Sequence, residues 1–207
     1  MANTSRPSGL RPIRHLSGSP WNGAISIYYH STANASAIYK GALVTSDAAL
    51  DSPTCGPDPL GIYQSIMVAA DDEPGCIGVA VAFGSQPQLL TLSTNLNSVN
   101  YCPASTGMYI GVVDDPSVIY EIEGNNASWA SSNIGDNCDT SNNAAGSAVT
   151  GRSTCVADNA ALTAATAQLR ILRLVNRPDN AIGAYCKLEV MIAEQLIAGD
   201  MAAYATT

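Results

Sequence analysis

The chain has little charge and few of the residues that catalytic and metal sites need. Only 13% of its 207 residues are charged, which is about half the usual share. Its two histidines, His15 and His30, lie beside no serine or cysteine in a nucleophile motif. No two of the six cysteines form a C-x-x-C pair, so we expect no zinc site. These scarcities predict a protein that is not an enzyme and that uses no metal or cofactor.

Long apolar segments are also missing. No apolar run reaches the roughly 18 residues that a membrane helix needs. The first residues are rich in Arg, Pro and Ser, and they lack the apolar stretch of a secretory signal. We therefore expect neither a signal peptide nor a membrane partner.

Acidic residues are absent from the first 46 positions. This segment holds four basic residues, Arg6, Arg11, Arg14 and Lys40, whereas the rest of the chain holds five basic and 17 acidic residues. A basic segment on an acidic body predicts an arm that reaches for a negative surface, either protein or nucleic acid. The acidic body argues against nucleic acid as the main partner, because phosphate binding needs clustered Lys and Arg.

Prolines and glycines punctuate residues 1–23, which predicts an extended arm because proline disfavours both helices and sheet interiors. Four apolar residues set this segment apart from a disordered tail. Trp21, at the junction with the body, is expected to pack on the body or on a neighbouring chain. The residues predicted to contact other subunits are Arg6, Leu10, Arg11, Ile13, Arg14, Leu16 and Trp21.

What the chain does contain is a series of short runs rich in Val, Ile and Tyr. They are separated by turns that contain Gly, Pro and Asp, which predicts an all-β sandwich or barrel in a single domain over residues 24–195. Residues 196–207 are expected to be a tail. The predicted strands are 24–29, 37–44, 62–69, 77–83, 108–113, 118–123, 168–175 and 185–192.

Two regions of this domain carry more specific expectations. The strands 108–113 and 118–123 flank Asp-Asp-Pro-Ser, which predicts a hairpin. Residues 124–159 are rich in Asn and Ser, and they are expected to form a long loop insertion with one short helix near Trp129.

Several charged residues were weighed as functional groups. The carboxylate clusters at residues 71–73 and 114–115 each precede a proline, which favours a turn over an acid/base pair or a calcium site. Arg170 and Arg173 stand three residues apart in one predicted strand, so they are expected to point to opposite faces. Their role would be surface contacts or salt bridges between subunits.

Three segments together resemble the capsid cement (decoration) proteins of tailed bacteriophages. They are RPSGLRPIRHLSGSPWNG at residues 6–23, PASTGMYIGVVDDPSVIYEIE at 103–123 and LRILRLVNRPDNAIG at 169–183. The resemblance implies a jelly-roll-like β body without catalytic residues, made in the host bacterial cytoplasm and assembled as a homotrimer on the outside of the virion capsid. There it would bridge major capsid proteins and stabilise the shell.

A second hypothesis is a virion surface module that binds a host receptor or a glycan. Exposed aromatic residues in the loop around Trp129 would favour it.

The six cysteines leave two alternatives open. They are either reduced thiols buried as small apolar groups, or partners in disulfides formed after a particle leaves the reducing cytosol. In the second case Cys138 and Cys155 are the favoured pair, because they flank a segment poor in large apolar residues. The remaining pairs would be Cys55–Cys76 and Cys102–Cys186, and bridges between subunits are also open.

Overall fold

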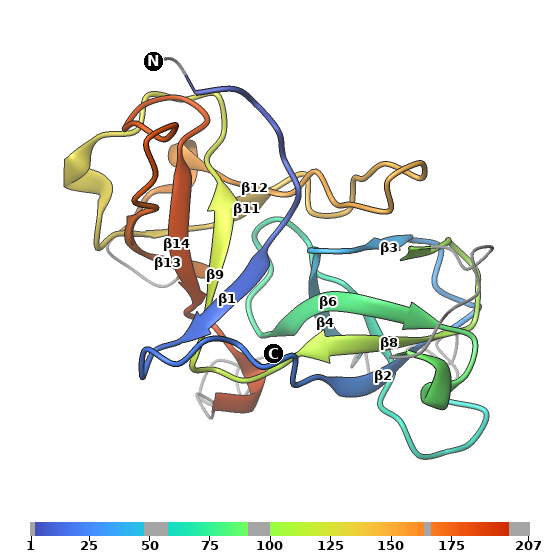
Figure 1. Cartoon of the computed structure of the whole chain (residues 1–207). Helices are drawn as coiled ribbons and strands as arrows, with labels where there is room; N and C mark the ends of the chain where they lie inside the picture. The colour runs from blue at the N-terminus through green and yellow to red at the C-terminus, as the bar shows by residue number, and fades with distance from the viewer. Residues whose placement is uncertain (1–2, 48–57, 91–99, 164–166, 199–207) are drawn as a thin grey trace.

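The computed structural model describes residues 3–47, 58–90, 100–163 and 167–198, and they fold almost wholly as antiparallel strands (Figure 1). Two five-stranded sheets carry the fold. Sheet A has the order β1-β9-β14-β13-β10, and sheet B has the order β2-β8-β6-β4-β5. The predicted all-β class is confirmed, as two packed sheets with open edges.

The elements of each sheet come from distant parts of the chain. Sheet A contains β1 (Arg11–His15), β9 (Val118–Glu123), β14 (Lys187–Ile192), β13 (Leu169–Leu174) and β10 (Asn137–Cys138). Sheet B contains β2 (Ser26–His30), β8 (Met108–Val113), β6 (Cys76–Gly84), β4 (Leu43–Ser46) and β5 (Ile66–Val68). Two small sheets pair β3 (Ile38–Tyr39) with β7 (Tyr101–Cys102) and β11 (Thr140–Ser141) with β12 (Val156–Ala157). Four single-turn 3-10 helices are η1 (Pro87–Leu89), η2 (Ser131–Asn133), η3 (Asn159–Ala161) and η4 (Leu196–Ala198).

The two sheets share one hydrophobic core. Its members include Leu43 and Val79 of sheet B and Tyr120, Leu169 and Leu188 of sheet A, all with at most 1% of their surface exposed. A second cluster lies on sheet B around Ile66 and Ile110. Because the first cluster draws on both sheets, neither sheet can lose its partner without exposing apolar surface.

The predicted hairpin of β8 and β9 is wrong, although both strands are present. β8 pairs with β2 and β6 in sheet B, whereas β9 pairs with β1 and β14 in sheet A. Residues 114–117 therefore form a corner between sheets. The Asp114 carboxylate accepts a hydrogen bond from the Tyr28 hydroxyl at 2.9 Å, and the Asp115 carboxylate accepts one from the Ser117 amide at 2.8 Å. This supports the interpretation of these carboxylates as turn residues.

The predicted N-terminal arm does not extend away from the body. It is extended, but it packs on its own body: β1 pairs with β9, and Leu10 is only 2% exposed in the shared core. The Leu10 amide donates to the Gly41 carbonyl at 2.8 Å, and a Cβ on Gly9 would lie 2.4 Å from the same oxygen. The predicted arm is therefore not free of the body, since β1 lies in sheet A and Leu10 lies in the shared core. Pro12 is tolerated because β1 is an edge strand with an irregular register.

The loop insertion is partly structured. It contributes β10, β11 and β12, and the predicted short helix near Trp129 is η2. Trp129 itself is 3% exposed and belongs to the shared core, so it is not a surface aromatic that could bind a receptor. The predicted strand 37–44 is divided into β3 and β4 by a turn at Gly41, which has φ +89°. The predicted tail begins with η4, and its last residues, 199–207, lie outside the described part of the chain.

Candidate functional site

The outer face of sheet A carries a row of charged side chains. The register pairs Arg11 with Glu121, Glu121 with Glu189, and Glu189 with Arg173. Residues that are directly opposite in neighbouring strands point to the same face, so these side chains form a line across four strands. The opposite face of the same strands contributes Tyr120, Ile122 and Leu188 to the core.

Glu189 is the centre of this row. Its carboxylate accepts hydrogen bonds from Arg14 at 2.7 Å and from Arg173 at 2.9 and 3.0 Å. Burial alone would raise its pKa, but the hydrogen bonds from Arg173 and Arg14 outweigh burial, and the pKa lies below its ordinary value. Glu189 is therefore charged at neutral pH, and it links the N-terminal strand to β13 across the sheet.

Glu123 has the same function at the end of β9. Its side chain is 1% exposed, and its carboxylate accepts hydrogen bonds from the Ser5 hydroxyl at 3.0 Å and from the Arg6 amide at 2.8 Å. Lys187 completes the site with an ion pair to the same carboxylate. One buried carboxylate thus connects the N-terminal segment, β9 and β14.

Most of the basic residues of the chain gather on this side of the molecule. Arg177 joins the row through Glu121 at 3.1 Å and Asp179 at 3.5 Å. We define the cationic face as the seven of the nine basic residues that lie on or beside the outer surface of sheet A: Arg6, Arg11, Arg14, Arg170, Arg173, Arg177 and Lys187. Four acidic residues lie among them, Glu121, Glu123, Asp179 and Glu189, so the face is positive on a chain whose net charge is −8.

The predicted orientation of Arg170 and Arg173 is wrong. Arg170 pairs with Met191 and Arg173 pairs with Glu189, and the register shifts between Ile171 and Arg173. This irregularity inserts one extra residue, so both arginines lie on the outer face of the sheet. Arg11 and Arg170 are exposed, and neither guanidinium has a partner among the described residues.

The structure brings the predicted contact residues to three different environments. Leu10 lies in the core, and Trp21 is half-buried against it. Arg6 and Arg11 are exposed on the cationic face, where Arg14 pairs with Glu189. Ile13 is half-buried in β1, and Leu16 is 58% exposed at the turn that follows β1. The segments that carry the family resemblance also meet here, because they supply β1, β9 and β13.

A cysteine–histidine contact escaped the sequence analysis because its partners lie 72 residues apart. The Cys102 Sγ lies 3.2 Å from the His30 Nδ1, and both residues are fully buried. The His30 ring nitrogens also lie 3.0 Å from the carbonyl oxygens of Thr106 and Ser36. Burial raises the pKa of Cys102 to about 12, the reverse of an activated nucleophile. The contact therefore holds the β2 and β7 regions together.

The disulfide pairs that the described residues can test are wrong. Cys76, Cys102, Cys138, Cys155 and Cys186 are all free and buried, and Cys55 lies outside the described residues. Cys138 and Cys155 lie in the same hydrophobic cluster, but they are not bonded to each other. Cys102 and Cys186 belong to different hydrophobic clusters.

The five described thiols should resist alkylation in the native protein. Burial raises the pKa of Cys76 and Cys138 to about 12 and that of Cys186 to about 11, so almost no thiolate forms at pH 8. Iodoacetamide should modify these cysteines only after guanidinium is added, as peptide mass spectrometry would show. A disulfide-linked peptide involving any of the five in the non-reduced digest would contradict the free-thiol structure.

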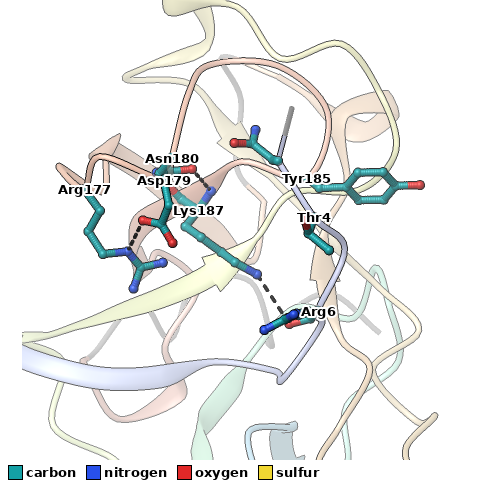
Figure 2. Close-up of a pocket in the computed structure, with 8 residues that line it drawn as sticks. Thr4, Arg6, Arg177, Asp179, Asn180, Tyr185 and Lys187 are labelled. Atoms are coloured by element: carbon teal, nitrogen blue, oxygen red, sulfur yellow. Dashed lines mark hydrogen bonds and ion pairs between the residues drawn. The ribbon is translucent and has the colours of Figure 1, made fainter. Parts of the chain in front are cut away.

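Two cavities adjoin the cationic face, one on each side of the first residues of the chain. The smaller, about 350 Å³, is lined by Arg6, Arg177, Lys187 and Tyr185 together with Asn3, Thr4, Asp179 and Asn180 (Figure 2). Figure 2 shows that the Lys187 side chain reaches the Arg6 backbone and that the Tyr185 ring points away from both Arg177 and Lys187. The larger cavity, about 540 Å³, lies beyond Glu123 toward β11 and β12.

Comparison with models of known families, with curated proteins and with solved structures found no match to this chain. Within the described ranges, no three His, Cys, Asp or Glu side chains are grouped so that they could hold a metal ion. None of the helices in these ranges has the length and apolar character of a membrane span.

Proposed function

We propose that this chain is a structural protein of a tailed-phage virion that binds the outer surface of the capsid through the cationic face of sheet A. The observation that carries the proposal is the concentration of seven of nine basic residues on or beside one sheet of an acidic protein. Such a face favours a partner of opposite charge, and a repeating acidic protein lattice supplies one at every subunit. The resemblance of three segments to cement proteins supports the same function, with the homotrimer and the major capsid protein as partners.

A bridging function needs a second contact away from the cationic face. Residues 145–154 form a hairpin that is closed by a bridge between Gly146 and Ser153, and its second arm packs beside β3, where the Ser153 amide donates to the Lys40 carbonyl at 2.9 Å. Val149 in this hairpin is 94% exposed, and a projecting apolar side chain suits a contact with a neighbouring subunit. If one copy of the chain binds one capsid subunit through its cationic face and the next capsid subunit through this hairpin, it would resist the separation of the two subunits.

The charge of the face provides a direct test. We expect the variant Arg11→Glu/Arg170→Glu to bind purified empty capsid shells at least tenfold more weakly than the wild type, because both guanidinium groups are exposed and unpaired in the described chain. Binding of the wild type should also weaken as NaCl rises from about 50 to 500 mM, since salt screens exposed charges. Sedimentation of the shells with bound protein measures both effects.

The control is Leu60→Glu/Ile62→Glu, which adds negative charge at two residues that precede β5 of sheet B, outside both the cationic face and the 145–154 hairpin. Both side chains are more than half exposed, so this variant should fold normally and keep its affinity within about threefold. Equal losses in the two variants would show a general charge effect and would contradict the proposed face. Binding to DNA instead of shells at the same salt concentration would assign the face to nucleic acid.

A further inference from the structure

The larger cavity beside the cationic face has the features of a ligand site. It lies between the N-terminal segment, the end of β9 and the small sheet β11–β12, and its volume of about 540 Å³ falls within the usual range for small-ligand sites. Its wall combines apolar surface from Pro7 and Val156 with the aromatic ring of Tyr185. The cavity thus has a mixed lining with one aromatic side chain at its edge.

The polar side chains of this cavity are free to bind. Asn126, Ser141, Asn142 and Thr154 line it, and their side chains have no hydrogen-bond partner among the described residues. The Tyr185 hydroxyl has none there either. Together they present amide and hydroxyl groups that both donate and accept hydrogen bonds.

The charged group of the same wall is already engaged. The Glu123 carboxylate is held by Ser5, Arg6 and Lys187, as described above. The Asn125 amide is likewise committed, because it donates to Asp158 at 2.6 Å. The described lining therefore offers a ligand neutral hydrogen-bonding groups and no unpaired charge.

Two residues of this lining adopt an unusual backbone conformation. Among the described residues only three other than glycine have positive φ, and two of them, Asn142 at 59° and Tyr185 at 58°, line this cavity. Asparagine tolerates this conformation, but it is strained for tyrosine. The surrounding hydrogen bonds hold it, since the Tyr185 amide donates to the Asn125 carbonyl at 3.2 Å and the Asn142 amide donates to Asp71 at 3.1 Å.

We propose that this cavity binds a neutral oligosaccharide. Sugar hydroxyl groups donate and accept hydrogen bonds, which matches the free amides and hydroxyls, and the apolar face of a sugar ring packs on an aromatic ring such as Tyr185. An anionic glycan would favour the adjacent smaller cavity, where the guanidinium of Arg6 is exposed. The site is separate from the exposed arginines that carry shell binding, so either function can exist without the other.

The test uses the full-length protein on an array of immobilised neutral and anionic glycans, followed by calorimetric titration of each neutral glycan that binds. Tyr185→Asn removes the ring and keeps a residue suited to positive φ, so the fold should be maintained. We expect wild-type binding to neutral glycans, at least a tenfold loss of affinity in Tyr185→Asn, and a change of less than threefold in Tyr185→Phe, which keeps the ring. Asn126→Ala should weaken binding by several fold.

Three results would overturn the proposal. They are the absence of binding to any neutral glycan, an unchanged affinity in Tyr185→Asn, and binding confined to anionic glycans that is lost in Arg6→Ser. Measurements of shell binding on the same variants distinguish a failure of the glycan proposal from a failure of the proposed capsid function. Tyr185→Asn should bind shells like the wild type, whereas Arg11→Glu/Arg170→Glu should bind glycans like the wild type.

Discussion

Deletion of residues 1–20 should remove a large fraction of the free energy of unfolding and shift the urea midpoint to a much lower concentration. The deletion removes β1 from sheet A, takes Leu10 out of the core and removes the partner Arg14 from the buried Glu189. Full burial of one leucine contributes about 2–3 kcal/mol, and a buried carboxylate that loses a partner adds to the loss. Since domains are stable by only about 5–15 kcal/mol, the sum is a large fraction of the total.

Urea unfolding followed by circular dichroism would measure this effect. The control within the same segment is Leu16→Ser, whose side chain is 58% exposed at a turn, and it should change the free energy of unfolding by no more than about 0.5 kcal/mol. A truncated protein with an unchanged midpoint would mean that residues 1–20 do not pack on sheet A. It would restore the alternative of an arm that docks on another chain.

Glu123→Ala should lower the free energy of unfolding by about 3–5 kcal/mol, the range for breaking a buried ion pair from one side. The change leaves Lys187 without its carboxylate and also removes the acceptor for the Ser5 hydroxyl and the Arg6 amide. The first residues of the chain should then detach, which limited proteolysis with N-terminal sequencing would detect. Denaturant unfolding gives the magnitude.

The matched control lies two residues earlier on the same face of β9. Glu121→Ala breaks an ion pair with Arg177, which is 39% exposed and keeps a second partner in Asp179, so a loss of about 1 kcal/mol or less is expected. The double variant Glu123→Gln/Lys187→Gln should recover part of the loss, because it leaves no unpaired charge. Equal effects at Glu121 and Glu123 would contradict the buried position of Glu123.

The local pattern of the sequence was sufficient for the strands but not for their partners. Runs of Val, Ile and Tyr between Gly, Pro and Asp turns predicted β2, β6, β8, β9, β13 and β14 to within a few residues. The same pattern predicted a β8–β9 hairpin, because a short turn with a proline looks the same whether it joins neighbours or forms a corner between sheets. Whether β8 and β9 form a hairpin or a corner depends on which apolar surfaces they can bury. Those surfaces belong to residues far away in the chain.

The candidate site was also predicted only in part from the sequence. Composition revealed that the N-terminal segment is basic and the body acidic, but β13, β14 and the loop between them supply four more basic residues only after sheet A forms. The irregular register in β13, which turned Arg170 and Arg173 to one face, has no signal in the sequence. The residues that line the larger cavity come from five separate segments, and their spacing along the chain gives no sign that they meet.

The sequence by itself determined the all-β class, the position of most strands and turns, and the scarcity of catalytic residue types. Those properties follow from side-chain alternation, β-propensity and turn chemistry, which act over a few residues. The tertiary structure decided the fate of the N-terminal segment, the state of the five described cysteines and the assembly of the cationic face. Each of these depends on which distant groups are brought within hydrogen-bonding or van der Waals distance, and only the shared burial of both sheets fixes that arrangement.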